Sequence, residues 1–140
     1  MPLLRVLLVD DNPTDRILAQ EAFSEYELNV ELTVLNSGAE ALDYMHQHGG
    51  RLPDVLLLDI NMPVMTGLEL LAHMKQEPEL AHIPVVMLTT SGAISDVQQA
   101  YTLQASSYLV KSPDFGNFLS QVEAFITYWQ GNRFRYSRVP

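Results

Sequence analysis

Three aspartates stand directly after mostly apolar runs of the sequence. Asp10 and Asp11 follow LLRVLLV, and Asp59 follows VLLL. Two later apolar runs are followed by Thr89 and by Lys111. The carboxyl ends of parallel strands meet at one edge of a sheet. If these runs are parallel strands, carboxylates, a hydroxyl and an ammonium group meet at that edge.

Carboxylates gathered in one place repel one another, so at least one of them resists ionisation unless a cation is present. Mg²⁺ meets this need, because it takes oxygen ligands and commonly uses one or two carboxylates with phosphate oxygens and water. Lys111 supplies a point charge for an anion, and the Thr89 hydroxyl can donate a hydrogen bond. Such a set suits phosphoryl transfer, in which positioning and charge do most of the work.

Each of these residues has a plainer interpretation when it is taken alone. Asp10 and Asp11 can be solvated loop acids that cap a helix. Lys111 can be an ordinary surface lysine, and Thr89 an ordinary hydroxyl at a strand end. The sequence HQH at 46 to 48 resembles a metal site, but it has no nearby acid partner, which favours a solvated helix end.

Five short β-rich runs alternate with five longer amphipathic segments. Most of the short runs are continuously apolar, which is typical of strands buried on both faces of a parallel sheet. Alternating strands and helices predict a doubly wound α/β fold. We expect the strands at Leu4–Val9, Val30–Leu35, Val55–Leu58, Val85–Leu88 and Tyr108–Val110.

The helices are marked by their first residues. Asn12 suits the N-cap position, with Pro13 at the first helical position. Two capping boxes follow, Ser37 with Glu40 and Thr66 with Glu69. The stretch Ile94–Leu103 has a weaker pattern. The last helix is predicted by one apolar stripe: Phe115, Phe118, Leu119, Val122, Phe125, Ile126 and Trp129.

Length and charge limit the class of protein. The 140 residues suit one domain, expected over residues 1–130, and the tail 131–140 is too short for an output domain. A net charge of −9 argues against a nucleic-acid surface, and no cysteine is present to form disulfides. No apolar run approaches the roughly 20 residues of a membrane helix. The start turns acidic too soon for a signal peptide, so we expect a cytoplasmic protein.

Four stretches, LLVDDN, LLLDINMPVMTG, PVVMLTTS and SYLVKSP, occur in this order. In order and spacing they resemble the receiver domain of bacterial two-component response regulators, over about residues 3 to 130. The resemblance implies a flavodoxin-like (βα)5 fold with strand order 2-1-3-4-5. It also implies a signalling protein rather than an enzyme, which takes a phosphoryl group from a sensor histidine kinase and signals through protein contacts.

The resemblance implies a role for each acid. Asp59 matches the phosphoacceptor, which forms an aspartyl phosphate. Asp11 and Asp59 match direct ligands of Mg²⁺, for which Mn²⁺ can substitute. The backbone carbonyl of Asn61 matches a third ligand, and Asp10 a ligand that binds through water.

The remaining motif residues match contacts and switch positions. Thr89 and Lys111 match the residues that contact the phosphoryl group. Tyr108 matches the aromatic residue whose rotamer reports the phosphorylated state. Asn61 and Ser91 fall where the family tunes the lifetime of the aspartyl phosphate.

The sequence departs from the family after the lysine. The family usually has proline there, joined by a cis bond, whereas here Ser112 precedes Pro113. Either the Lys111–Ser112 bond is cis, at roughly 2.5–4 kcal/mol, or the Ser112–Pro113 bond is cis, or the loop has another shape. The glycine usual before the aromatic residue is also replaced, by Ser107.

The stretch VKSPDFGNFLSQVEAFITYW resembles stand-alone regulators that partner phytochrome-type sensor kinases. This resemblance implies a red-light-sensing histidine kinase as the phosphodonor. The tail carries Arg133, Arg135 and Arg138 between Phe134 and Tyr136. It is either a frayed end or an arm that packs on an acidic neighbour. We expect a homodimer through the last helix–strand–helix face and this tail.

Three other functions fit the sequence less well. A phosphatase of the haloacid dehalogenase kind needs two aspartates spaced by one residue, whereas Asp10 is followed by Asp11 and then Asn12. A flavodoxin needs a phosphate loop after the first strand, where acids would repel a phosphate. A binding module that has lost phosphorylation would not need the complete acid set.

Overall fold

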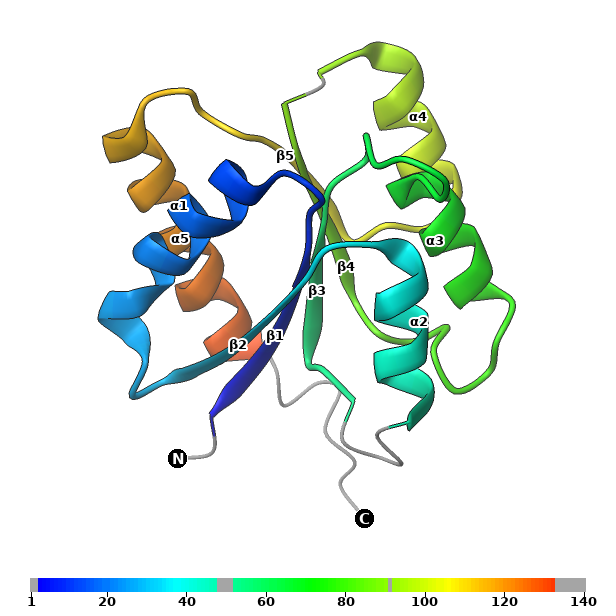
Figure 1. Cartoon of the computed structure of the whole chain (residues 1–140), viewed down its shortest axis with the longest axis horizontal. Coiled ribbons are helices and arrows are strands. Elements are labelled where there is room, and N and C mark those ends of the chain that lie inside the picture. The colour runs from blue at the N-terminus through cyan, green and yellow to red at the C-terminus, as the bar shows by residue number, and fades with distance from the viewer. Residues whose placement is uncertain (1–2, 48–51, 91, 133–140) are drawn as a thin grey trace.

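A five-stranded parallel sheet forms the centre of the molecule. The computed structural model describes residues 3–47, 52–90 and 92–132. The strand order is β2-β1-β3-β4-β5, as predicted (Figure 1). Three strands have the expected bounds, whereas β4 includes Thr89 and β5 begins one residue earlier, at Ser107. The strands are β1 (Leu4–Val9), β2 (Val30–Leu35), β3 (Val55–Leu58), β4 (Val85–Thr89) and β5 (Ser107–Val110).

Helices cover both faces of the sheet. On one face lie α1 (Pro13–Phe23) and α5 (Phe115–Asn132), and on the other lie α2 (Gly38–Gln47), α3 (Gly67–Lys75) and α4 (Ile94–Thr102) (Figure 1). A short 3₁₀ helix, η1 (Ser24–Tyr26), follows α1. None of the described helices is both long enough and apolar enough to cross a membrane.

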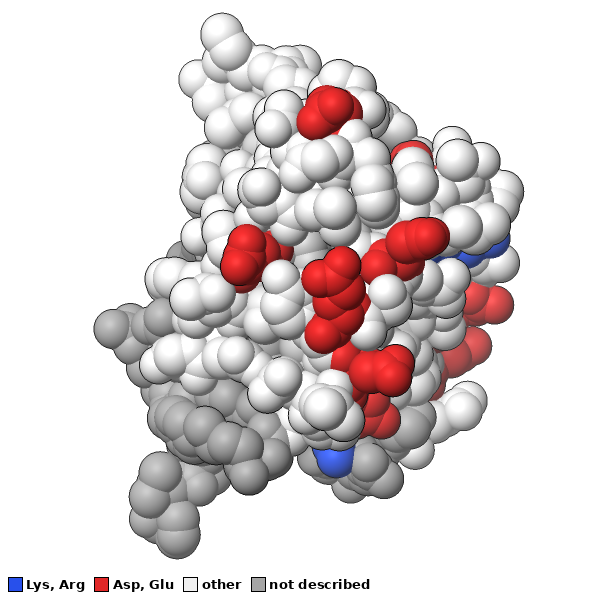
Figure 2. Space-filling view, turned by 90° about the vertical axis from the view of Figure 1, so that its left-hand side faces the viewer, with Lys and Arg blue, Asp and Glu red and all other residues white. Residues whose placement is uncertain are grey.

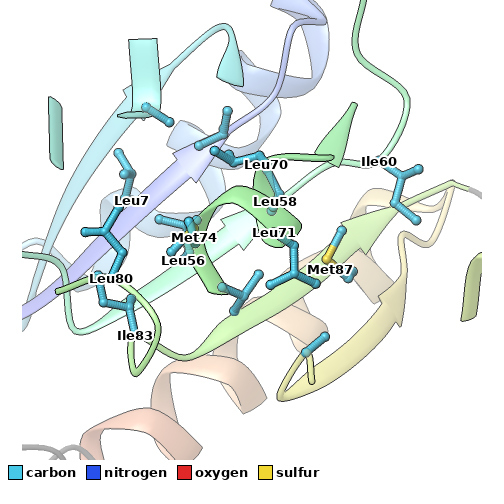
Figure 3. Packing of buried hydrophobic residues seen from close by; sticks show 14 of the residues in the cluster. Leu7, Leu56, Leu58, Ile60, Leu70, Leu71, Met74, Leu80, Ile83 and Met87 are labelled. Carbon is cyan, nitrogen blue, oxygen red and sulfur yellow. The ribbon is translucent and has the colours of Figure 1, made fainter. Parts of the chain in front are cut away.

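Successive residues of the central strands point to opposite faces of the sheet. Leu56 on β3 belongs to the cluster under α2, α3 and α4, which Figure 3 shows from close by. Leu57, the next residue, belongs to the cluster under α1 and α5. Both side chains are buried. The continuous apolar runs of the sequence therefore reflect burial on both faces.

The predicted helix starts are present, with one difference in detail. The Asn12 side chain accepts a bond from the backbone of α1, and the capping box that begins α3 is complete. At α2 the Ser37 hydroxyl accepts from the Glu40 amide as expected. The Glu40 carboxylate, however, accepts from the amide of Asn36 rather than that of Ser37. The reciprocal bond of the capping box at α2 is thus made to the residue before the N-cap Ser37.

Two other expectations about side chains are corrected. Phe115 does not join the buried stripe of α5, since it is 37% exposed, whereas Trp129 at the other end is buried. His46 does have an acid partner, because its Nε2 atom lies 2.7 Å from Glu77 Oε1. Glu77 follows α3 and is 31 residues from His46, so the sequence alone does not reveal this contact. His48 lies outside the described residues.

The loop from β3 to α3 is tight because α3 begins against the end of β3. The Gly67 amide donates to the Ile60 carbonyl at 2.8 Å. A Cβ atom on Gly67 would lie 2.1 Å from the carbonyl oxygen of Asp59. Within this loop Val64 adopts a φ of 68°, a left-handed conformation that is unfavourable for a β-branched residue. Close packing therefore constrains the backbone that carries Asp59.

We predict opposite effects for alanine at two helix glycines. Gly67→Ala forces backbone apart at the end of β3 and should lower the free energy of unfolding by at least about 2 kcal/mol. Gly131→Ala is the control, since a Cβ atom there meets nothing within 4 Å. It should change stability by less than about 1 kcal/mol, in the stabilising direction. Urea unfolding of both variants measures this, and equal effects would contradict the proposed close packing.

Candidate functional site

The side chains predicted to gather at the carboxyl ends of the strands do lie together. Asp10 and Asp11 follow β1, and Asp59 follows β3. One carboxylate oxygen from each lies within 4.8 Å of the others. Asp10 is 3% exposed and Asp59 8% exposed, while Thr89, at the end of β4, is fully buried. The carboxylates of Asp10 and Asp59 are therefore largely removed from water, which strengthens their repulsion, whereas Asp11 is half-buried.

Backbone and side-chain donors orient two of the acids. The Ile60 amide donates to Asp59 Oδ1 at 2.9 Å. The Asn12 amide donates to Asp10 Oδ1 at 3.0 Å, and Arg16 Nη1 donates to the Asp10 backbone carbonyl at 2.9 Å. The Asp59 amide also donates to the Val9 carbonyl at 3.0 Å, which continues the β1–β3 ladder. The carboxylates of Asp10 and Asp59 are thus oriented by backbone amides of the segments that follow β1 and β3.

Asp59 resists ionisation more than an ordinary aspartate. Burial and then the charge of Asp10 raise the pKa of Asp59 to about 6. Lys111, a hydrogen bond with Thr89 and the bond from Ile60 act in the opposite direction, and they do not cancel the rise. This is the behaviour that the sequence predicted for carboxylates gathered without a cation.

Lys111 is bound by two acids. Its Nζ atom lies 3.0 Å from Asp10 Oδ2 and 2.9 Å from Asp15 Oδ2. Burial by itself lowers the pKa of Lys111, but the bonds to Asp15 and Asp10 outweigh this and leave the pKa raised. Asp15 had no role in the sequence interpretation. Its position three residues after the N-cap Asn12 was a usable signal, because it places an acid in the first turn of α1 beside the strand ends.

The loop after β5 differs from each of the cis arrangements that the sequence left open. All peptide bonds in the described residues are trans, including those on both sides of Ser112. Gln121 of α5 donates its amide to the Val110 carbonyl at 2.9 Å and accepts from the Ser112 amide at 3.1 Å. The Lys111 amide donates to the Thr89 carbonyl at 2.7 Å. These bonds hold the loop in another shape, which the sequence motif alone did not reveal.

The other predicted residues lie around this centre. Asn61 is exposed in the loop two residues after Asp59. Tyr108 on β5 is half-buried and packs against the core cluster under α2, α3 and α4. Ser91 lies outside the described residues.

The donor set fits a small divalent cation. All the gathered side-chain ligands are carboxylate oxygens, and hard cations such as Mg²⁺ and Mn²⁺ prefer oxygen. A cation would also relieve the repulsion that raises the pKa of Asp59. Asp10, Asp11 and Asp59 can hold such an ion, and Lys111 and Thr89 can bind an anion beside it.

Comparison with known proteins gives a consistent answer. The family model of the response regulator receiver domain matches residues 6–123. The response regulator Rcp1 of Synechocystis sp. is 37% identical over 128 residues, which cover 89% of this chain and 87% of Rcp1.

Solved structures agree with the sequence relatives. The phosphorylated cyanobacterial phytochrome response regulator RcpA has a TM-score of 0.85 and 34% identity, covering 92% of this chain and 95% of RcpA. The Mn²⁺-bound form of Rcp1 has a TM-score of 0.80 and 36% identity, covering 89% of this chain and 93% of that one. The fold and the acid cluster agree with these matches. This chain belongs to the response regulator receiver domain family and is related to phytochrome response regulators.

Proposed function

We propose that this protein is a single-domain response regulator of the cytoplasm, phosphorylated on Asp59 by a sensor histidine kinase. The observation that carries the proposal is the meeting of Asp10, Asp11 and Asp59 within 4.8 Å, with Lys111 bonded to Asp10. The similarity to phytochrome response regulators supports a phytochrome-type kinase as the phosphodonor. In this proposal the protein assists its own phosphorylation and dephosphorylation, and it is not an enzyme acting on separate substrates.

Asp59, which matches the family's phosphoacceptor, is the proposed nucleophile. Both oxygens of Asp10 are engaged, one by the Asn12 amide and the other by Lys111. Asp59 lies at the end of the central strand, oriented by the Ile60 amide. In the proposed reaction a carboxylate oxygen of Asp59 bonds to phosphorus while the bond from phosphorus to the kinase histidine breaks. The histidine nitrogen keeps that electron pair.

The proposed cofactor is Mg²⁺, for which Mn²⁺ can substitute. Asp11, Asp59 and the Asn61 carbonyl would be direct ligands, and Asp10 would bind through water. The Mn²⁺-bound form of the relative Rcp1 supports a divalent ion. A bound cation would neutralise negative charge on the carboxylates and on the incoming phosphoryl group.

Thr89 and Lys111 are the proposed contacts of the phosphoryl group. Thr89 is buried at the end of β4 and already bonded to the Asp59 side chain, so a phosphoryl group there would compete for its hydroxyl. We propose that this pulls on the segment between β4 and α4, with Tyr108 reporting the change through its rotamer. Asn61 and Ser91 are the proposed determinants of the phosphorylated lifetime.

The proposed output is protein contact through the face formed by α4, β5 and α5. β5 is an edge strand of the described sheet, and a groove of about 620 Å³ lies between it and α5. Leu109, Tyr128 and Trp129 are among the groove residues, and Tyr128 is 54% exposed. We propose that a second copy of the chain covers this face. Residues 1–130 form the receiver domain in this proposal, and the tail 131–140 begins within the last turn of α5.

Charge supports a role for the tail in that dimer. Figure 2 shows acidic side chains gathered on the side of the molecule where α1 and α5 lie. The exposed acids of these elements include Glu21 and Glu123. The tail carries Arg133, Arg135 and Arg138, and from Arg133 onward it lies outside the described residues. A basic tail of one copy would be attracted to the acidic side of another.

Asp59→Asn should abolish Mg²⁺-dependent labelling by acetyl phosphate, because the amide cannot serve as the nucleophile. Asp43→Asn, which changes an exposed acid on α2, should label like the parent. Phosphoprotein gels or intact-mass spectrometry with and without EDTA measure the labelling. A variant lacking Asp59 that labels as well as the parent would show that another residue is phosphorylated.

Asp59→Asn should also change how stability depends on pH in EDTA. A carboxyl whose pKa is about 6 when folded and about 3.9 when unfolded stabilises the fold only while protonated. That contribution is complete below about pH 4 and is lost as the pH rises through about 6. The stability of Asp59→Asn relative to the parent should therefore grow by about 2–3 kcal/mol from pH 4 to pH 7.5. Urea unfolding measures this, and a difference independent of pH would contradict the burial argument.

Dimerisation should depend on Tyr128 and on the tail. The full chain should have about twice the monomer mass of 15.8 kDa by light scattering. A chain ending after Asn132, where α5 ends, should shift towards the monomer, as should Tyr128→Glu on the groove. The exposed Thr127, next to Tyr128 on α5, provides the control variant Thr127→Glu. A full chain of monomer mass would remove the dimer proposal.

A further inference from the structure

Asp15 is an acid of the site to which the proposed phosphorylation assigns no task. It lies in the first turn of α1 and is not one of the three carboxylates grouped for a cation in the described part of the chain. Its Oδ2 atom lies 2.9 Å from Lys111 Nζ. The same Lys111 Nζ atom also bonds to Asp10. The ammonium group is therefore tied to both the end of β1 and the start of α1.

The start of α1 fixes Asp15 in this position. The Asp15 amide donates to the Asn12 side chain at 3.0 Å, which sets the first turn of the helix. Negative charge at a helix N-terminus is stabilised by the helix dipole. The side chain of Lys111 is 11% exposed and that of Asp15 is 30% exposed, so solvent screens this pair only in part. The contact is thus stronger than an ion pair at an open surface.

A phosphoryl group on Asp59 would meet Asp15 as a competitor. An ammonium group has three N–H donors. Asp10 and Asp15 already take two of those on Lys111, which leaves one for the oxygens of a phosphoryl group. The phosphoryl group also brings about two negative charges, which Asp15 repels. Both effects favour the unphosphorylated protein. A cavity of about 450 Å³, lined in part by Asp15, Lys111 and Phe115, leaves room for the ammonium group to turn.

We propose that Asp15 is a positioning residue that anchors Lys111 to α1 in the unphosphorylated protein and competes with the phosphoryl group for it. Asp15 thereby sets how strongly the site holds a phosphoryl group without touching that group. The inference rests on the proposed phosphorylation of Asp59. In this proposal Asp15 limits the stability of the phosphorylated state and takes no part in forming the aspartyl phosphate.

Beryllofluoride with Mg²⁺ tests this, because it stands in for a phosphoryl group on a carboxylate. Asp15→Asn should bind beryllofluoride about fivefold to tenfold more tightly than the parent in calorimetric titrations. Asp15→Glu keeps the charge and should stay close to the parent. Glu21→Gln removes the same charge from an exposed position of α1 and should also stay close to the parent.

A double-mutant cycle separates an effect through Lys111 from a general effect of charge. In a Lys111→Met background, Asp15→Asn should give less than about a twofold change, because the competition for the ammonium group is gone. An equal gain in both backgrounds, or no gain from Asp15→Asn alone, would overturn the inference. If the parent itself binds no beryllofluoride, the proposed phosphorylation fails and the inference fails with it. If the parent binds and Asp15→Asn gains nothing, only the inference fails.

Discussion

Repulsion among three carboxylates held at one end of a buried sheet is the constraint on which this structure depends. Asp10, Asp11 and Asp59 cannot separate, because each follows a strand whose position is fixed by its neighbours. The structure meets the constraint in two ways. The pKa of Asp59 rises to about 6, and Lys111 is drawn into the cluster. A site organised in this way favours the binding of a cation, and it leaves Asp59 as the acid suited to modification.

The sheet provides the rigidity that makes such crowding possible. Its central strands are buried on both faces, and neighbouring residues of β3 pack into separate hydrophobic clusters. The start of α3 lies so close to the carbonyl of Asp59 that only a glycine fits at position 67. Moving these strands apart would require disrupting closely packed backbone and side chains. The charge is therefore held in place by hydrophobic packing beneath it.

The sequence predicted the parts of the site that follow from chain direction, and it missed those that depend on helix placement. Parallel strands bring their carboxyl ends to one edge, so the meeting of Asp10 with Asp59 could be predicted from two apolar runs. The contact of Asp15 with Lys111 depends on how α1 is rotated against the sheet, and the bonds of Gln121 depend on where α5 lies beside β5. The apolar stripe of a helix predicts which of its faces packs on the sheet, but it does not predict which polar groups lie beside that helix. The shape of the loop at Ser112 was uncertain for the same reason.

Lys111 lies where the chemistry and the proposed output face meet. Its side chain bonds to Asp10 and Asp15, and its amide donates to the Thr89 carbonyl. The two peptide groups next to it are bonded by one side chain, Gln121, which also lines the groove between β5 and α5. A shift of Lys111 towards a new anion on Asp59 would therefore strain the two hydrogen bonds that Gln121 of α5 makes to this segment. The amide of Gln121 thus lies between the backbone of Lys111 and that groove, as the middle member of a contiguous set of contacts.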